Sequence, residues 1–231
     1  MKTIGLIGGM SWESSLHYYR IINETVKERL GGLHSAKCLL YSVEFAEVEL
    51  MQRQGRWGES AALLGDIAKN LEGAGADFIV ICTNTMHKVA AEVQAVIQIP
   101  LLHIADATAQ KIVERGFTKI GLLGTRFTME EGLYKDRLIQ KYGLQVLIPE
   151  LPERKLLHRV IYEELCLGTI DPSSKAQFKG IINGLVGVGA QGIILGCTEI
   201  GMLIQDEDCP VPLFDTTLIH ALAAVDIALA E

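Results

Sequence analysis

The sequence predicts an α/β protein built from two similar lobes, each with a doubly wound parallel sheet. Strand-length apolar runs alternate with helix-length segments, and several runs end in small polar residues, as buried parallel strands do. Three pairs of segments repeat each other in the same order in the two halves: 4–8 and 120–124, 79–84 and 193–198, and 99–102 and 211–214. This order indicates an internal duplication, with one lobe over residues 1–115, a second over 116–231, and a last helix free to cross back to the first lobe.

The composition is typical of a protein with a large core and a small ligand. Of the 231 residues, 49% are hydrophobic, and the formal net charge is −7, with Lys and Arg scattered singly. This distribution argues against a nucleic-acid or anionic-membrane surface, which needs clustered positive charge. The first apolar run is too short for a secretion signal, and glycines interrupt the uncharged stretch 180–198. We therefore expect a cytoplasmic protein without a membrane span.

The first lobe is expected to open with a strand over residues 3–7, a glycine turn, and a helix from about residue 13 with Ser11 as its N-cap. The helix stripe expected to face the core is Leu16, Tyr19, Ile22 and Val26. The later elements are expected as strands at 38–43, 78–82 and 99–104 and helices at 61–71, 85–96 and 106–115. A polar connection that carries Gln52 precedes the helix at 61–71.

The second lobe restarts this pattern, so its strand ends correspond to those of the first. Parallel sheets bind ligands outside the carboxyl ends of their strands, and we expect the matched ends of the two lobes to meet across a cleft. The apolar stretches at 79–85 and 193–199 both end there. The sequence therefore predicts one active site that contains Thr83 and Cys197.

No metal or cofactor is expected at this site. The five cysteines are odd in number, irregularly spaced and without a Cys-x-x-Cys pair. The Gly8-Gly9 turn is not the G-x-G-x-x-G of dinucleotide-binding proteins, and nothing around Lys88 indicates a pyridoxal phosphate site. Strand alternation points Cys82 away from the face of Thr83, so Cys82 is interpreted as a core residue.

Cys197 is the stronger candidate for chemistry. It stands at a strand end, where the helix N-terminus that follows is expected to lower the thiol pKa. A thiolate can act as a general base on a weakly acidic C–H bond. Gly196, directly before it, indicates close approach of the backbone to a ligand. The alternative is a buried structural thiol.

Four motifs together resemble the aspartate/glutamate racemase family, especially its bacterial amino-acid racemase branch: Gly8-Gly9-Met10, residues 82–87, Thr125 with Thr128, and residues 196–199. The resemblance covers the full length. It implies a homodimeric, cofactor-independent racemase whose leading substrates are L-aspartate and L-glutamate. It also implies that one residue from each lobe flanks the α-carbon, one removing the proton and the other delivering a proton to the opposite face. Both residues are ordinarily cysteines.

This sequence departs from the family pattern at the reacting position of the first lobe. Asn84-Thr85 fixes the alignment and places Thr83 where a cysteine ordinarily stands. A hydroxyl is a far weaker base than a thiol but can still donate a proton, so we expect preferential turnover of L-substrates, with Cys197 as base and Thr83 as acid. The Arg and Lys that hold the side-chain carboxylate in archaeal aspartate racemases align with Val48 and Cys166, which leaves the preferred amino acid open.

Hydroxyl and amide groups near the strand ends are candidates to bind the substrate carboxylate together with backbone N–H groups. The expected substrate-binding residues are Met10, Gln52, Asn84, Thr85, Thr125, Thr128, Thr198 and Glu199. A threonine at a helix start is often only an N-cap, and Glu199 could position the ammonium group, tune the thiol or merely favour a helix N-terminus. His87 is interpreted as a structural histidine.

Two other functions remain open at this stage. Maleate isomerases and arylmalonate decarboxylases of the same superfamily use similar lobes and a cysteine, so the reaction could be isomerisation or decarboxylation of a small acid. Duplicated α/β lobes around a cleft also describe non-catalytic ligand-binding sensors. A sensor would bind amino acids without turning them over.

Overall fold

The computed structural model describes residues 1–230, apart from the side chain of Leu133, and divides the chain into two compact units. Unit 1 comprises Met1–Ile104 with His220–Glu231, and unit 2 comprises Ala105–Ile219. Each unit is an α/β fold around a four-stranded, fully parallel sheet. The fold class predicted from the repeats is therefore confirmed.

Unit 1 has the strand order β2-β1-β3-β4. Its strands are β1 (Ile4–Gly8), β2 (Cys38–Ser42), β3 (Phe78–Ile81) and β4 (Leu101–Leu102). Its helices are α1 (Trp12–Leu30), α2 (Phe45–Arg53), α3 (Trp57–Gly73), the 3₁₀ helix η1 (Thr85–Val89), α4 (Ala90–Gln94) and most of α11 (Thr216–Leu229). Helix α2 lies where we expected only a polar connection. The Glu44 side chain caps it by accepting from the Ala46 N–H, and it buries Val48 and Gln52.

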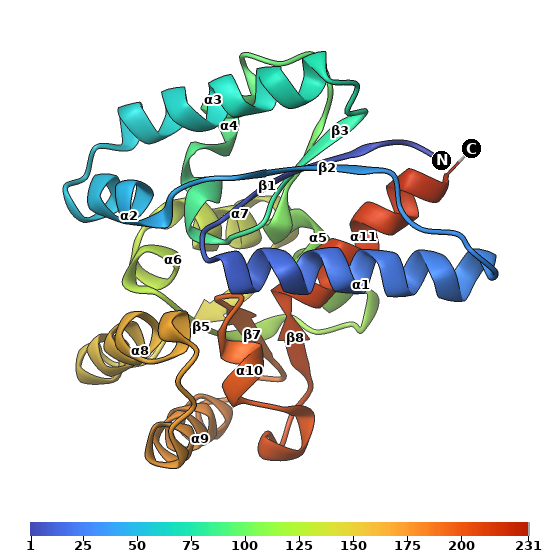
Figure 1. Cartoon of the computed structure of the whole chain (residues 1–231). Helices are drawn as coiled ribbons and strands as arrows, with labels where there is room; N and C mark the ends of the chain where they lie inside the picture. The colour runs from blue at the N-terminus through green and yellow to red at the C-terminus, as the bar shows by residue number, and fades with distance from the viewer. Residues whose placement is uncertain (231) are drawn as a thin grey trace. The chain divides into compact units, whose positions relative to one another are not determined.

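Two hydrophobic clusters cover the two faces of this sheet, as alternating strand residues require. Ile79 and Ile81 of β3 pack with α3 and α4, whereas Phe78, Val80 and the following Cys82 pack with α1 and α11. Figure 1 shows these two helix layers on either side of the sheet of unit 1. The interpretation of Cys82 as a core residue agrees with its position here, because its side chain is fully buried.

The buried stripe of α1 differs from the one expected. Leu16 and Tyr19 are 58% and 47% exposed, whereas Tyr18 is fully buried together with Ile22 and Val26. Tyr18 is buried because its hydroxyl has a partner inside unit 1, at 2.9 Å from Nδ1 of His220. A hydrophobic pattern alone cannot show that a polar aromatic side chain finds such a partner.

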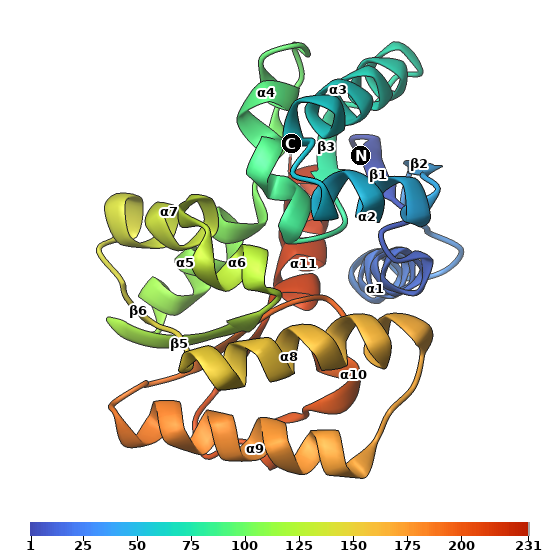
Figure 2. The same ribbon diagram turned by 90° about the vertical axis from the view of Figure 1, so that its left-hand side faces the viewer.

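Unit 2 has the strand order β6-β5-β7-β8. Its strands are β5 (Lys119–Gly124), β6 (Gln145–Leu147), β7 (Ile193–Gly196) and β8 (Leu213–Asp215). Its helical elements are α5 (Ile104–Glu114), α6 (Arg126–Glu130), α7 (Gly132–Tyr142), α8 (Leu151–Glu163), η2 (Leu165–Leu167), α9 (Pro172–Gly187), α10 (Ile200–Leu203) and η3 (Asp206–Asp208). Figure 2 shows α8 and α9 on one side of β5 and α5, α6 and α7 on the other.

The division between the units differs from the expected boundary after residue 115, because α5 belongs to unit 2 almost entirely. Asp106 of α5 forms ion pairs with Arg137 (2.6 Å) and Lys141 (2.8 Å) of α7. The chain end returns to unit 1, where the Lys2 N–H donates to the Ala228 carbonyl oxygen at 2.8 Å. None of the helices described over residues 1–230 is long and apolar enough to cross a membrane.

Candidate functional site

The candidate residues in unit 2 are grouped around Cys197, which directly follows β7. Its thiol donates a hydrogen bond to Oε2 of Glu199 at 2.9 Å, and the Thr198 hydroxyl donates to the same oxygen at 2.7 Å. Glu199 is only 3% exposed, so this carboxylate is held in place beside the thiol. Of the roles considered for Glu199, its contact with Cys197 fits tuning of the thiol.

The electrostatics around Cys197 oppose the expected fall in thiol pKa. Burial raises the pKa of Cys197 well above 9.0, and the neighbouring Glu199 and Cys166 raise it further. The helix that follows, α10, has only 4 residues, so its N-terminus offers little compensation. In the free protein the group is therefore a thiol that donates to Glu199, and its thiolate needs a cation nearby.

Gly196 is explained by packing within the sheet, and not by approach to a ligand as the sequence indicated. A Cβ atom at this position would lie 2.7 Å from the Leu123 carbonyl oxygen and 2.9 Å from Cδ1 of Leu122. Both atoms belong to β5, which pairs with β7 in parallel. Glycine thus allows β5 and β7 to pair directly before Cys197.

Thr125 and Thr128 lie at the carboxyl end of β5, in the same unit as Cys197. Thr125 is the N-cap of α6, where its hydroxyl oxygen accepts from the Thr128 N–H at 3.4 Å. The two hydroxyl oxygens are 3.3 Å apart, and the side chains are 4% and 2% exposed. Thr125 can therefore be an N-cap and still bind a ligand, since its hydroxyl oxygen accepts from the backbone while its hydrogen remains able to donate to an anion.

The candidate residues in unit 1 are grouped around Thr83, two residues after β3. The Thr83 N–H donates to the Ile81 carbonyl oxygen at 2.9 Å, and the side chain is 8% exposed. Within the part of the chain that the structure describes, its hydroxyl forms no hydrogen bond. Burial raises the pKa of the adjacent Cys82 thiol far above its usual range, because that thiol lies in the core.

His87 holds the backbone of Thr83 in one position. Its Nδ1 lies 2.7 Å from the Thr83 carbonyl oxygen, and its Nε2 lies 3.2 Å from the Ile104 nitrogen. A carbonyl oxygen only accepts and a backbone N–H only donates, so Nδ1 carries the hydrogen and Nε2 is the acceptor. The ring is thus a neutral bridge between the end of β3 and the start of α5.

A second histidine, His220, packs beside His87. The His220 ring lies 5.6 Å from the His87 ring, its Nε2 is 2.9 Å from the Leu102 carbonyl oxygen, and its Nδ1 faces Tyr18. Burial, with a contribution from His87, lowers the pKa of His220 to about 3. Among residues 1–230 no group of three or more His, Cys, Asp and Glu side chains could hold a metal ion.

The remaining expected binding residues of unit 1 are mostly buried. Gln52 donates from Nε2 to the Met86 sulfur at 3.0 Å, and Met10 belongs to the hydrophobic cluster that also contains Val48. Asn84 directly follows Thr83 and is 4% exposed. Thr85, half-buried, begins η1. The structure thus gathers Thr83, Asn84 and Thr85 at one strand end of unit 1.

Comparison with known proteins identifies a family that this chain resembles over most of its length. The model of the Asp/Glu/hydantoin racemase family matches residues 7–224. A crystal structure from Yersinia pestis described as that of an Asp/Glu racemase is 56% identical to this chain, with all of both chains covered and a TM-score of 0.94. An aspartate racemase homologue from Pyrococcus horikoshii is 35% identical, again over all of both chains, with a TM-score of 0.86.

A more distant relative acts on several amino acids. The broad-specificity amino-acid racemase RacX of Bacillus subtilis is 24% identical over 168 residues, covering 71% of this chain and 70% of its own length. The family match runs from β1 to α11 and therefore includes both strand ends that carry Thr83 and Cys197. By the extent of this match, together with its two parallel-sheet units, the chain belongs to the Asp/Glu/hydantoin racemase family.

Proposed function

We propose that this protein is a cofactor-independent racemase that converts L-aspartate and L-glutamate to their D-enantiomers. The observation that carries the proposal is the 2.9 Å hydrogen bond from the Cys197 thiol to the buried Glu199 carboxylate. In this pair the Glu199 carboxylate can accept the thiol proton, and the Cys197 thiolate that results can remove an α-proton. Membership of a racemase family supports the same reaction.

In the first step, the substrate ammonium group approaches Glu199 and offsets the negative charge that keeps Cys197 protonated. The thiol proton passes to Glu199, and the resulting thiolate removes the α-hydrogen of the L-substrate. The electron pair of the C–H bond stays on the substrate as a carbanion, and Cys197 becomes a thiol again.

In the second step, Thr83 delivers a proton to the opposite face of the α-carbon. The Thr83 O–H bond breaks as the new C–H bond forms. The Thr83 oxygen regains a proton from a solvent water, and Glu199 releases to solvent the proton that it took from Cys197, so all three side chains are unchanged after turnover. The hydroxyl has no competing hydrogen bond among the described residues, which leaves it available for this role. Because a hydroxyl is a poor base, removal of the proton from a D-substrate is expected to be slow.

Backbone N–H groups and the side chains of Asn84, Thr85, Thr125 and Thr128 are proposed to bind the α-carboxylate. Thr198 has a different role from the one expected, since its hydroxyl donates to Glu199 and orients it. Gln52 and Met10 are proposed to shape the site from unit 1. The protein is proposed to act as a cytoplasmic homodimer, and light scattering would measure its mass in solution.

The preference for acidic substrates rests on the family and not on a visible side-chain anchor. Val48 is fully buried in the core of unit 1, and Cys166 carries no positive charge. Ranking amino-acid enantiomers by kcat/KM tests the preference. If alanine or homoserine exceeded both acidic substrates by tenfold or more, the assignment to acidic amino acids would be wrong.

The reaction itself is tested by incubation of the protein with single amino-acid enantiomers in D₂O, with α-deuteration and chirality followed over time. A racemase produces D-amino acid that carries α-deuterium. The same assay after dialysis against a chelator, with and without added metal or pyridoxal phosphate, tests independence from cofactors. Loss of activity that only metal or pyridoxal phosphate restores would contradict that part of the proposal.

The presence of one thiol, where family members ordinarily have two, also favours a second candidate reaction. A single thiol suffices when a carbanion formed by decarboxylation takes up one proton, or when a cysteine attacks a double bond during isomerisation. Incubation with substituted malonates and with maleate would reveal these activities as loss of carbon dioxide or formation of fumarate. Binding of amino acids without deuteration or turnover would instead identify a sensor.

A further inference from the structure

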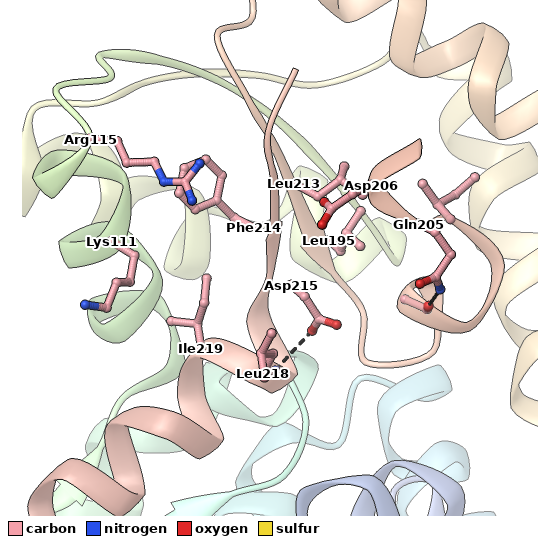
Figure 3. Close-up of a pocket in the computed structure, with 12 residues that line it drawn as sticks. Lys111, Arg115, Leu195, Gln205, Asp206, Leu213, Phe214, Asp215, Leu218 and Ile219 are labelled. Carbon is pink, nitrogen blue, oxygen red and sulfur yellow. Dashed lines mark hydrogen bonds between the residues drawn. The ribbon is translucent and has the colours of Figure 1, made fainter. Parts of the chain in front are cut away.

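The two parallel sheets have four edge strands, of which β2 in unit 1 is the longest. β2 has 5 residues, whereas β4 has 2 and β6 and β8 have 3 each. The edge at β8 borders a cavity of about 360 Å³ whose walls carry the charged Lys111, Arg115 and Asp206, as Figure 3 shows. Short strands and charged side chains both keep a sheet edge from pairing with another chain. β2 has neither protection, because its sequence, Cys-Leu-Leu-Tyr-Ser, contains no charge and no proline.

The outer backbone groups of β2 form no hydrogen bond among residues 1–230. In a parallel sheet, successive residues of a strand direct their N–H and C=O groups to opposite sides in turn. The Lys37 carbonyl oxygen and the Val43 N–H bond to β1, at 2.9 and 3.0 Å, so the odd-numbered residues between them also face β1. Cys38, Leu40 and Ser42 therefore direct their backbone groups away from the sheet. This edge can accept another strand.

An exposed apolar stripe of α1 lies beside this edge. Trp12, Leu16 and Tyr19 stand at positions i, i+4 and i+7 of the helix, and all three are exposed. Asn23 continues the stripe, and its Oδ1 accepts from the Ala36 N–H, two residues before β2, at 3.0 Å. Figure 2, which views α1 almost along its axis, shows the helix next to β2. A contiguous exposed apolar surface is typical of a region that another molecule covers.

Leu40 connects the strand edge with this stripe. Its side chain is 45% exposed and lies on the face of the sheet that α1 covers. A Cβ atom at Gly8 would lie 3.0 Å from Cδ1 of Leu40 and 2.5 Å from Oγ of Ser15 on α1. We call the combined area the α1/β2 surface, which consists of Trp12, Leu16, Tyr19, Leu40 and the outer backbone groups of β2.

We propose that the α1/β2 surface is an interface with a second copy of this chain, in which the two β2 strands pair antiparallel about a twofold axis at Leu40. Leu40 would then exchange two backbone hydrogen bonds with Leu40 of the partner subunit. Cys38 would lie opposite Ser42 of the partner subunit. The sheets of the two copies of unit 1 would become one continuous sheet, and no exposed β2 edge would remain.

The side chains of this surface fit a second copy because no like charges oppose each other at the axis. A twofold interface places a residue on the axis opposite itself, so a charged residue there would be repelled by its own copy. Leu40 occupies that position on β2, and Leu16, next to Ser15, occupies it on α1. Antiparallel packing of the two α1 helices then brings Glu13 near Arg20 of the partner subunit, so the charges that flank the apolar stripe are complementary.

The assignment of this surface rests on the homodimer of the proposed function and adds where its two subunits meet. Mass and covalent linkage test it, and catalysis does not enter. A dimer joined at β2 that racemised no amino acid in the D₂O assay would refute the proposed reaction alone. A racemase whose dimer did not depend on the α1/β2 surface would refute the interface and leave the reaction standing.

Light scattering of the intact protein, coupled to size exclusion, tests the interface first. The parent protein should have twice the mass of one chain at micromolar concentration. Leu16→Asp, which places two carboxylates opposite each other, should weaken dimerisation roughly tenfold or more. Ile139→Asp, the matched change of an exposed apolar helix residue in unit 2, should remain a dimer. Circular dichroism would verify that both variants fold. A monomeric parent protein, or equal dimerisation of the two variants, would overturn the proposal.

Disulfide cross-linking tests the register of the two strands. Ser42→Cys places a new thiol opposite the native Cys38 of the partner subunit, and residues opposite each other in an antiparallel pair are close enough for a disulfide. Oxidised glutathione should therefore link this variant into a covalent dimer, with two protein thiols oxidised and one glutathione disulfide reduced for each bond formed. Ser173→Cys, a change of an exposed serine on α9, is the control and should give no such link. Peptide mapping should find position 42 joined to Cys38, and linkage to another cysteine, or no covalent dimer, would overturn the proposal.

Discussion

The two strand ends that carry Thr83 and Cys197 follow the same backbone pattern but hold their residues in opposite ways. Thr83 is fixed through its carbonyl oxygen by the neutral His87, whose other ring nitrogen accepts from the Ile104 N–H. Cys197 is fixed through its sulfur atom, which donates a hydrogen bond to the buried Glu199 carboxylate. The difference teaches that corresponding strand ends of a duplicated fold can be held by unlike contacts, a carboxylate on the side chain in unit 2 and a neutral ring on the backbone in unit 1.

The largest effect should come from removal of the thiol in unit 2. Cys197→Ala is expected to reduce α-proton exchange of L-aspartate by about 10³-fold or more, since no other base remains for the first step. Exchange in D₂O followed by NMR would measure the loss. Cys209→Ala, which removes another half-buried thiol of unit 2, is the control and should retain exchange. Full exchange by Cys197→Ala would assign the base to another group.

Removal of the hydroxyl in unit 1 should separate exchange from inversion. Thr83→Ala leaves Cys197 able to remove and return a proton on its own face, so L-aspartate should become deuterated with its chirality retained. Inversion should fall by about 10²-fold. An equal loss of exchange and inversion would contradict distinct roles for the two residues.

Replacement of Thr83 by cysteine should give both units a thiol at the corresponding strand end. Thr83→Cys is expected to raise kcat for D-aspartate by about tenfold, because a thiol can act as a base where a hydroxyl cannot. Because kcat/KM must remain equal in the two directions at an equilibrium constant of one, any change in kcat/KM for D-aspartate should appear equally in kcat/KM for L-aspartate. If D-turnover stayed the same and Cys82→Ala abolished the L-reaction, Cys82 and not Thr83 would be the reacting residue.

The effect of the Glu199 carboxylate on Cys197 should be measurable in the pH dependence of kcat/KM. Glu199 raises the pKa of the Cys197 thiol, so Glu199→Gln should lower that pKa and shift the alkaline rise of kcat/KM for L-aspartate to lower pH. The maximum rate should fall roughly tenfold, because the thiol proton loses its acceptor. Glu207→Gln, on the exposed helix η3, is the control. A profile that did not move would exclude coupling between Glu199 and Cys197.

The smallest effect is a loss of folding stability at acidic pH, caused by the buried neutral His220 of unit 1. The folded pKa of His220 is about 3, below its unfolded value near 6.5, so the unfolded chain binds a proton that the folded protein does not. Stability should therefore fall by up to about 1.4 kcal/mol per pH unit as pH decreases from about 6.5 towards 3. Denaturant unfolding at pH 7 and 5 measures this slope. His220→Gln should reduce it, and an unchanged slope would show that other groups account for the loss.

Much of the fold follows from local sequence. The paired apolar runs predict two parallel sheets because a strand buried on both faces must be apolar throughout, and the order of the runs predicts the duplication. The motifs 82–87 and 196–199 likewise indicate where reactive side chains follow strands. Each of these inferences depends on residues that are neighbours along the chain.

The tertiary structure decided what depends on residues that are distant in sequence. The ion pairs of Asp106 with α7 place α5 in unit 2, and Tyr18 is buried because His220, about two hundred residues later, meets its hydroxyl. The raised pKa of Cys197 follows from burial, and the role of Gly196 follows from the pairing of β7 with β5. Burial, hydrogen-bond partners and close packing are properties of the folded chain, so no pattern of neighbouring residues could predict them.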